Sequence, residues 1–346
     1  MKKVFLMSFI LLSILTACNK NKDWEFPDYK YSTVYFPYQS PVRTLVLGED
    51  IFDNTLDNQH KFMIMATMGG VYENKKDVTL NVSVDNSLAQ NLKFGSATGD
   101  NVIAMPSNYY TFPKEMKIVI PSGKLEGGIE IQLTDAFFAD PLAIKNTYVI
   151  PLKINSVTGA DSVLVGKSSV TSPDRRKTTD WAVVPKDYVL YAVKYINPYH
   201  GIYLRRGKDD VKGNSGNTAL DTNIVYHKTY VEQDMLSNIY TKSLTQDTVS
   251  LVTRNKGSST DVPFRLLLTF NANGDIAVSA PASATFTATG TGKFVKKGDM
   301  WGNEKRDVMY LNYQVNFATT THNFTDTLVV RDRGVKFETF TPVIVP

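Results

Sequence analysis

Apolar and polar residues alternate along several segments in the first half of the chain. Residues 78–84 place valine or leucine at every second position, and residues 129–133 and 148–154 repeat the pattern. A period of two puts the apolar side chains on one face of an extended chain, so each segment predicts a half-buried β-strand. The apolar run Lys117–Ile120, stopped by a Pro-Ser-Gly turn, predicts a further strand. Before residue 180, only Asp135–Ile144 predicts a turn or two of helix.

Pro151 stands inside the alternating segment 148–154. Proline has no N–H to donate to a neighbouring strand, so this strand is expected at a sheet edge or beside a bulge. Short strands separated by frequent turns over about 150 residues predict an immunoglobulin-like β-sandwich for the first domain.

A polar stretch at Lys167–Lys177 contains a proline and lacks apolar periodicity, which is typical of a linker. We therefore expect the sandwich to cover residues 30–175 and a second domain to cover residues 186–346. Within the second domain, Asn271-Ala272-Asn273-Gly274 separates two apolar segments and predicts an antiparallel hairpin. Alternation over residues 309–317 adds another strand. Consecutive antiparallel strands predict a β-barrel or a second sandwich, and the expected fold class is all-β.

The N-terminus carries a separate pattern. Two lysines precede an apolar run from Val4 to Leu15, and Ala17 precedes Cys18, the only cysteine in the chain. This order is typical of a bacterial lipoprotein signal, since the run is shorter than the ~20 apolar residues of a spanning helix. We expect residues 1–17 to be cleaved, Cys18 to carry lipid in the outer membrane, and residues 18–29 to form a tether. The cell surface is favoured over the periplasmic leaflet, and an ordinary secretory signal is the alternative.

Composition and motifs argue against several classes of function. Without Lys2 and Lys3 the 38 basic residues fall to 36, against 34 acidic ones. The charges are interspersed, so no nucleic-acid partner is expected. The 4 histidines have no metal-ligand spacing, and the sequence has no phosphate loop, nucleophile elbow or nucleophilic cysteine. We therefore expect no catalytic residues, no metal, no cofactor and no enzymatic activity.

Several longer motifs resemble a known family. They are Ile120-Pro121-Ser122-Gly123, Ile129-Glu130-Ile131, Tyr148–Ile154, Gly201–Gly207, Trp301-Gly302 and Tyr310–Tyr313. Together they resemble a two-domain Bacteroidetes lipoprotein family. In that family an N-terminal sandwich domain, also found ahead of the catalytic barrel of some chitinase-like endoglycosidases, precedes a C-terminal barrel-like domain of unknown function.

The resemblance implies a function as well as a fold. Members resemble accessory proteins of outer-membrane glycan-uptake systems. The implied partners are therefore a polysaccharide or oligosaccharide and the outer-membrane uptake proteins. The catalytic barrel of the endoglycosidases is absent from this sequence, so their activity is not implied.

Aromatic residues are the leading candidates for a sugar site, because sugar rings stack on Trp and Tyr while polar side chains bond the hydroxyls. Trp301 precedes Gly302-Asn303, a turn at which an indole would stand at the surface. Asn303, Tyr203, Arg205 and Tyr310 are weaker candidates for the same ligand. The alternative for Trp301 is a ring that folds back to plug a barrel end. For Tyr203 and Tyr310 a place in the core or the barrel lining is favoured over a ligand-binding role.

Two other functions stay open at this stage. An adhesin or assembly protein would bind another protein through a sheet edge. A glycoside hydrolase would need two carboxylates that face one glycosidic bond, a condition that a sequence alone does not test.

Overall fold

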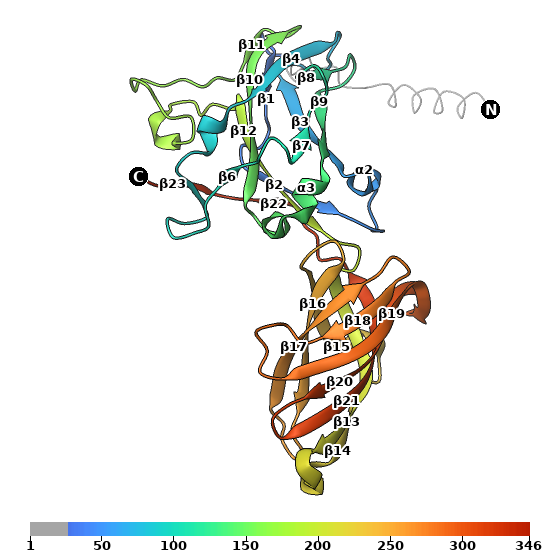
Figure 1. The fold of residues 1–346 in the computed structure, drawn as a ribbon. Coiled ribbons are helices and arrows are strands. Elements are labelled where there is room, and N and C mark those ends of the chain that lie inside the picture. Colours follow the sequence, from blue (N-terminus) through green and yellow to red (C-terminus); the bar gives the residue numbers. More distant parts are fainter. Residues whose placement is uncertain (1–26) are drawn as a thin grey trace, which may run out of the picture.

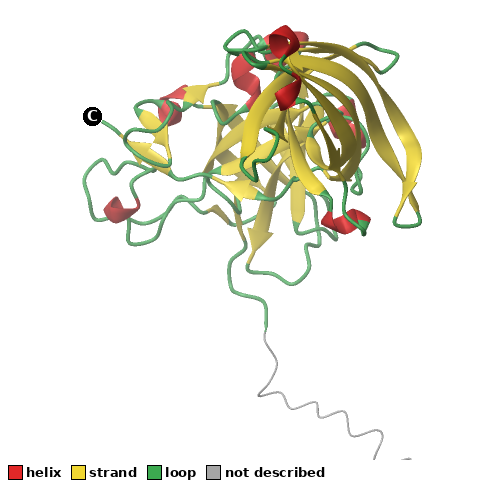
Figure 2. Ribbon diagram, turned by 90° about the horizontal axis from the view of Figure 1, so that it is seen from below, coloured by secondary structure: helices red, strands yellow, loops and turns green. Residues whose placement is uncertain are grey.

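The computed structural model describes residues 27–346, so the expected signal segment, Cys18 and most of the expected tether lie outside the described residues. The described chain is nearly all β, with 51% of residues in strands and 9% in helices. Two domains lie end to end (Figure 1), and the helices are short segments between strands (Figure 2). The expected all-β class is confirmed. No helix within residues 27–346 is long and apolar enough to cross a membrane.

Two sheets form the N-terminal domain. The strands of the first sheet are β1 (Thr33–Tyr35), β3 (Lys61–Gly69), β7 (Tyr110–Thr111), β9 (Glu126–Leu133) and β11 (Ser162–Val163). Those of the second are β2 (Pro41–Val46), β4 (Val78–Val84), β6 (Ile103–Ala104), β8 (Lys117–Ile120), β10 (Tyr148–Thr158), β12 (Tyr188–Ile196) and β22 (Glu338–Thr339). The first has the order β11-β1-β3-β9-β7, and the second has the order β22-β2-β12-β10-β4-β8, with β6 beside β10.

The core of this domain lies between the two sheets. Ile64 and Ile129 from the first sheet and Leu80 and Ile150 from the second are at most 2% exposed. Leu80, Ile129 and Ile150 are apolar positions of the alternating segments, and β4, β8, β9 and β10 confirm the predicted strands. The connections include α2 (Thr55–Asn58), α3 (Asp135–Ala139), η2 (Asn86–Ala89), η3 (Pro141–Ile144) and η4 (Thr178–Asp180). Helices α3 and η3 are the turns of helix predicted for residues 135–144. Strand β5 (Leu92–Phe94) pairs with β23 (Pro342–Ile344) and forms a separate two-stranded sheet.

The predicted domain boundary is wrong. Strand β12 pairs with β10 on one side and with β2 on the other, so residues 188–196 form an interior strand of the sandwich. The polar stretch Lys167–Lys177 is a surface excursion. Arg175 fixes it to the sandwich through an ion pair of 3.0 Å with Asp187, which is 1% exposed. Local polarity does not distinguish such an excursion from a linker.

The edge position expected for Pro151 is also wrong, because β10 lies inside the sheet between β12 and β4. Its pairing with β4 begins at Leu152 opposite Val84, so Pro151 lies just beyond the end of β4. The Pro151 carbonyl accepts the N–H of Asp85 at 2.8 Å. The proline nitrogen points to the same side as this carbonyl, towards β4. Because β4 has already ended there, the lack of an N–H on Pro151 breaks no hydrogen bond between the strands. The register shift in this pairing lies farther on, between Ile154 and Ser156.

The second domain is a closed barrel. Its strands are β13 (Gly201–Gly213), β15 (Met235–Thr241), β16 (Gln246–Arg254), β17 (Asp261–Phe270), β18 (Asp275–Ser279), β19 (Thr287–Trp301), β20 (Glu304–Asn316) and β21 (Thr320–Asp332). Neighbours pair antiparallel, and β21 pairs back onto β13, which closes eight strands into a ring. Closure removes the exposed sheet edges. The predicted β17–β18 hairpin and the alternating strand β20 are confirmed.

Short elements complete the barrel domain. Strand β14 (Thr222–Tyr226) pairs with the second half of β13, and η5 (Asn214–Gly216), η6 (Thr218–Leu220) and η7 (Val231–Gln233) lie in its loops. After β21 the chain returns to the sandwich, where β22 pairs with β2 and β23 pairs with β5. The second domain therefore does not extend to residue 346. The chain leaves the sandwich after β12, forms the barrel and returns to the sandwich at β22, so the barrel is an insertion in the sandwich domain.

Candidate functional site

Trp301 does not stand at the surface, so the expectation of an exposed indole is wrong. The residue is 8% exposed and packs with Leu204, Val308 and Val329. These three residues alternate with the inward-facing Tyr203, Met309 and Leu328, so they lie on the outer wall of the barrel. The guanidinium of Arg206 covers the indole at 5.2 Å from the ring centre. The ring therefore does not plug a barrel end either. It folds against the outside of the barrel because apolar side chains there offer burial.

Tyr203 and Arg205 face the barrel interior. Both are fully buried, and the Tyr203 hydroxyl donates to the carbonyl of Tyr199 at 2.7 Å. Tyr203 therefore lies in the core, as its alternative interpretation predicted. The burial of Arg205 contradicts a ligand-binding role for that residue. Asn303 stays exposed in the β19–β20 turn with φ of 62°. Tyr310 is 38% exposed on the outer face, so the five predicted residues do not converge on one site.

A buried polar network fills part of the barrel. Nε and Nη2 of Arg205 donate to the two carboxylate oxygens of Asp326 at 3.0 and 2.9 Å, and the Tyr313 hydroxyl donates to Asp326 at 2.6 Å. Burial raises the pKa of Tyr313 well above its usual value, and the charge of Asp326 adds to the effect. Tyr313 therefore stays protonated and donates to Asp326. The three side chains tie β13, β20 and β21 together.

A second interior group joins a carboxylate, an imidazole and a hydroxyl. His322 Nδ1 lies 2.8 Å from Asp209 Oδ2, and its Nε2 lies 3.0 Å from the hydroxyl of Thr320. The sequence of contacts from carboxylate to imidazole to hydroxyl is the same as in the catalytic triad of hydrolases. The three residues are at most 6% exposed, however, so no substrate reaches the hydroxyl. We interpret this group as part of the barrel core.

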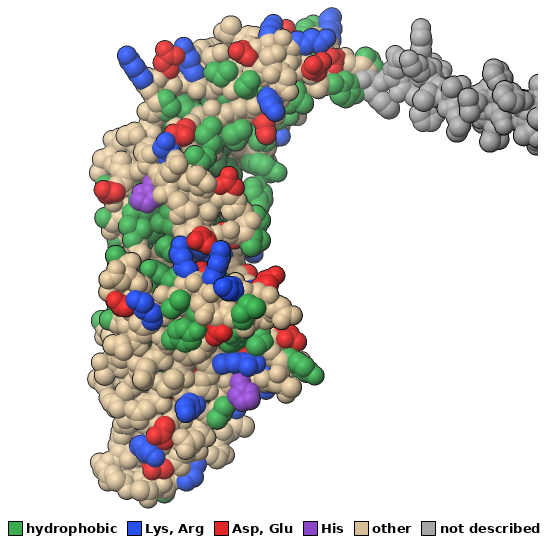
Figure 3. Space-filling model, turned by 90° about the vertical axis from the view of Figure 1, so that its right-hand side faces the viewer, with side chains coloured by type: hydrophobic (Ala, Val, Ile, Leu, Met, Phe, Trp, Pro, Cys, Tyr) green, Lys and Arg blue, Asp and Glu red, His purple; other side chains and the backbone are tan. Residues whose placement is uncertain are grey.

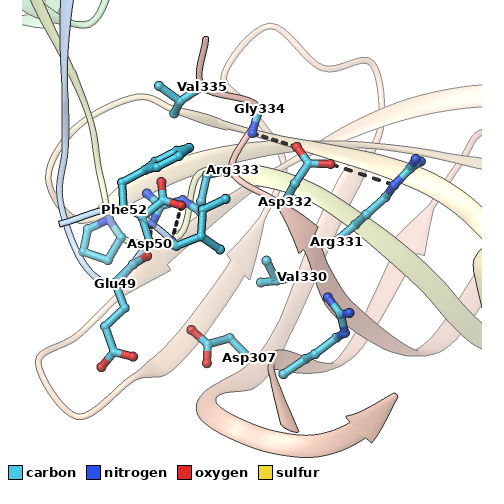
Figure 4. A pocket seen from close by; sticks show the side chains of 13 residues that line it. Glu49, Asp50, Phe52, Asp307, Val330, Arg331, Asp332, Arg333, Gly334 and Val335 are labelled. Carbon is cyan, nitrogen blue, oxygen red and sulfur yellow. Dashed lines mark hydrogen bonds and ion pairs between the residues drawn. The ribbon is translucent and has the colours of Figure 1, made fainter. Parts of the chain in front are cut away.

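A pocket of about 390 Å³ lies at the junction of the two domains (Figure 4). The sandwich contributes Glu49, Asp50, Ile51 and Phe52, the linker contributes Pro198, and the barrel side contributes Arg306, Asp307 and the segment Val330–Val335. Its size lies within the range of small-ligand sites. The residues that line the pocket therefore come from four segments that are far apart in the sequence.

Phe52 is the aromatic residue in the lining of this junction pocket. Its ring is 62% exposed, and the neighbouring Ile51 is 90% exposed. Asn54 fixes the base of this loop, because its Nδ2 donates to the carbonyls of Val46 at 2.8 Å and Gly48 at 2.7 Å. A polar anchor thus presents an exposed aromatic ring beside Val330 and Val335.

Charged groups of both signs complete the pocket. Asp307 accepts the backbone N–H of Lys297 at 2.8 Å, and Asp332 accepts that of Gly334 at 2.8 Å, so both carboxylates are oriented. The Asp50 Oδ2 atom is buried and has no hydrogen-bond partner within the described chain. A buried acceptor without a partner costs free energy.

Arg333 holds the junction together. Its Nη1 donates to the carbonyl of Glu49 at 2.9 Å, and its Nη2 to that of Leu47 at 3.1 Å. Its Nε donates to the carbonyl of His200 at 2.7 Å, and Nη2 also donates to that of Asn197 at 2.7 Å. The side chain is 8% exposed. One buried guanidinium therefore fixes the pocket loop and the linker relative to the barrel.

The signal for this pocket in the sequence is weak. Ile51-Phe52 is an apolar pair inside a loop of acidic residues and asparagines, which identifies an exposed hydrophobic site only once the loop is known to be on the surface. Within residues 27–346 no three His, Cys, Asp or Glu side chains gather in a way that would hold a metal ion.

Two family models match separate parts of the chain. A model of a domain of unknown function, DUF5627, matches residues 198–334, which contain the barrel. A second model, described as an N-terminal domain, matches residues 29–161. No curated protein matches the chain.

A solved structure of a Bacteroides ovatus protein of unknown function resembles nearly the whole chain. The two are 41% identical with a TM-score of 0.84, over 92% of this chain and 100% of that one. The chain belongs to this two-domain Bacteroidetes family. The family resemblance of the sequence motifs is therefore confirmed, and the DUF5627 domain of the family is the eight-stranded barrel described above.

Two other solved structures are only remotely similar. One is a second Bacteroides ovatus protein of unknown function, 13% identical with a TM-score of 0.38, over 90% of this chain and 99% of that one. The other is an auxiliary nutrient binding protein from Bacteroides thetaiotaomicron, 13% identical with a TM-score of 0.36, over 84% and 90%. These scores are too low to bear on the function of this chain.

Proposed function

We propose that this protein is an outer-membrane lipoprotein of the cell surface that binds an oligosaccharide in the junction pocket, as an accessory to polysaccharide uptake. The observation that carries the proposal is Phe52, an exposed aromatic ring on a fixed loop inside a pocket with oriented carboxylates and guanidinium groups. A sugar offers an apolar ring face and many hydroxyls, and this combination recognises both. The resemblance to accessory proteins of glycan uptake supports the same assignment.

Each group in the pocket has a definite role in this proposal. Phe52 stacks on a sugar ring, while Asp307 and Asp332 accept hydrogen bonds from hydroxyls. Arg306 and Arg331 donate to ring and hydroxyl oxygens. Arg333 keeps these groups in place, so little ordering is needed when the ligand binds, and preorganisation of this kind increases affinity. The protein acts as a binding protein and not as an enzyme.

A glycan array with the soluble chain from residue 27 tests the proposal. The wild type is expected to bind a defined set of oligosaccharides, and Phe52→Ala is expected to bind them about tenfold more weakly, since a stacked ring contributes about 1 kcal/mol beyond its buried area. Tyr230→Ala is the matched control, because Tyr230 is 60% exposed on a barrel loop outside the pocket. Binding that is insensitive to Phe52, or hydrolysis of a bound glycan, would contradict the proposal.

Ile51 favours a second candidate function. An aliphatic side chain that is 90% exposed contributes little to a sugar site, but it suits a protein interface. The adhesin or assembly alternative therefore places a protein partner on the same loop. A partner that is captured by the wild type and lost with Ile51→Ser, while no glycan binds, would favour this alternative.

A further inference from the structure

We propose that the end of the sandwich at which the described chain begins docks on a lipid bilayer through Tyr29, Tyr31 and Tyr72. The inference rests on the proposed lipid anchor at Cys18. It goes beyond that anchor, because a lipid tether alone leaves the orientation of the protein free.

Three tyrosines cluster on this end without cover from the described chain. Tyr29, Tyr31 and Tyr72 are 73%, 51% and 68% exposed. The rings of Tyr29 and Tyr31 lie 6.4 Å apart, and the backbone N–H of Tyr29 donates to the Gly70 carbonyl at 2.8 Å. The N–H of Tyr72 donates to Asp28 at 2.7 Å, which joins the two loops. Figure 3 shows hydrophobic side chains on the body beside the place where the described chain begins.

The occupant of this aromatic cluster follows from its distance to Cys18 along the chain. Residues 19–26 separate Cys18 from the first described residue, and they include Trp24 and Phe26, which continue the series of aromatic residues. Eight residues of chain can span at most about 30 Å. Lipid on Cys18 therefore keeps the cluster within reach of the bilayer. Tyr and Trp rings favour the headgroup level, where one part of the ring is apolar and the other is wet.

The charges around the cluster are mixed. Lys30, Lys75 and Lys124 are exposed at this end, and the loops that carry the last two are joined by the Gly123 N–H, which donates to the Asn74 carbonyl at 2.6 Å. Asp28 and Glu73, next in sequence to Tyr29 and Tyr72, are exposed as well. Lysines can reach lipid phosphates, but the nearby carboxylates oppose a net attraction. Insertion of the tyrosine rings, and not charge, therefore carries the docking.

Strand β3 shows what this docking does for the protein. It begins at Lys61, next to α2 and the pocket loop, and ends at Gly69, next to the tyrosine cluster. Nine residues of strand separate the two ends, which corresponds to about 30 Å. The barrel lies beyond the pocket, at the far end from the start of the described chain (Figure 1). Docking therefore holds the junction pocket and the barrel away from the membrane.

Depth-dependent quenching in vesicles tests the orientation. The lipidated mature chain is reconstituted in vesicles of phosphatidylethanolamine and phosphatidylglycerol that contain a quencher-labelled headgroup lipid. Cys18 is blocked by its lipid, so Lys75→Cys or Lys256→Cys supplies the only thiol for a fluorescent dye. Both lysines are exposed, one beside the tyrosine cluster and one in the β16–β17 loop of the barrel. Quenching at position 75 with none at position 256 is expected. Equal quenching at both positions, or at neither, would overturn the proposal.

Replacement of the tyrosines separates docking from anchoring. Tyr29→Ser with Tyr31→Ser should reduce quenching at position 75 at least twofold, whereas sedimentation with the vesicles should not change. Unchanged quenching in this variant would contradict a role for the rings. Loss of sedimentation in every variant would show that the lipid anchor itself is absent and would overturn the docking with it. Glycan binding by the soluble chain is independent of all these outcomes.

Discussion

Arg333 donates a hydrogen bond of 2.7 Å to the carbonyl of Asn197, and this bond joins the segment that leaves the barrel to the linker that enters it. The same guanidinium reaches the pocket loop at Leu47 and Glu49. The barrel is inserted into the sandwich domain, so both crossings of the junction pass this side chain. The shape of the pocket therefore depends on one buried residue.

Arg333→Ala is expected to lower both stability and glycan affinity. Several buried carbonyls lose their donor, so the free energy of unfolding should fall by about 3 kcal/mol. Thermal and urea unfolding measure this loss. Arg331→Ala is the control, because the Arg331 side chain is 53% exposed and its loss should affect binding but not stability. Equal stability of the two variants would show that Arg333 does not hold the junction.

Asp326→Ala should destabilise the barrel more than a double replacement does. The single variant leaves Arg205 as a buried charge without its partner, which costs about 3 to 5 kcal/mol. Arg205→Met combined with Asp326→Leu removes both charges and should cost less. Urea unfolding of both variants tests this order, and a double variant that is less stable than the single one would refute the interpretation.

Trp301→Ala should lower stability and leave glycan affinity unchanged. The indole packs on Leu204, Val308 and Val329 outside the barrel, so its loss should cost about 3 kcal/mol. Tyr310→Ala, on the same outer face, should cost less because Tyr310 is 38% exposed. Melting temperature and affinity are measured on the same samples. A loss of affinity without a loss of stability would restore Trp301 as a binding residue.

His200 should make the protein less stable in mild acid. Burial lowers the pKa of His200 to about 4, and the positive charges of Arg333 and Lys194 add to the shift. Its Nδ1 accepts the N–H of Thr241 at 3.1 Å, a bond that protonation breaks. His200 binds a proton near pH 6.5 in the unfolded chain but only near pH 4 in the folded one. The stabilisation of the folded state by neutral His200 is therefore complete above pH 6.5 and is lost as the pH falls towards 4. The loss in the free energy of unfolding is at most about 3 kcal/mol.

Urea unfolding between pH 7 and pH 4 of the wild type and His200→Gln measures this effect. The stability difference between the two proteins should shrink as the pH falls. Glutamine keeps an acceptor but does not titrate in this range, which makes it the matched control. A difference that stays constant over this range would exclude His200 as the source.

The regular elements could be predicted from the sequence because each one is encoded locally. Alternation identified β4, β9 and β10, and the Asn-Gly turn identified the β17–β18 hairpin. The domain boundary could not be predicted in this way. Strand β12 belongs to the sandwich only through its pairing with β2 and β10, and β22 joins the same sheet from the other end of the chain. No local pattern encodes such pairings.

The candidate site was missed for the same physical reason. Phe52, Asp307 and Asp332 are far apart in the sequence and meet only because the barrel is inserted into the sandwich domain. Trp301 follows a polar segment and precedes a tight turn, which is typical of an exposed tip. Its burial depends on how the β19–β20 hairpin folds against the barrel wall, and the sequence of the hairpin does not contain that information.

The most direct test of the proposed function is calorimetric titration of Phe52→Leu with an oligosaccharide that the wild type binds. Leucine keeps an apolar side chain on the loop but removes the aromatic face, so the change isolates stacking from loop structure. We predict that the dissociation constant rises about fivefold, as the loss of about 1 kcal/mol of stacking requires, while the melting temperature stays the same. An unchanged dissociation constant would contradict the assignment of the junction pocket as the glycan site.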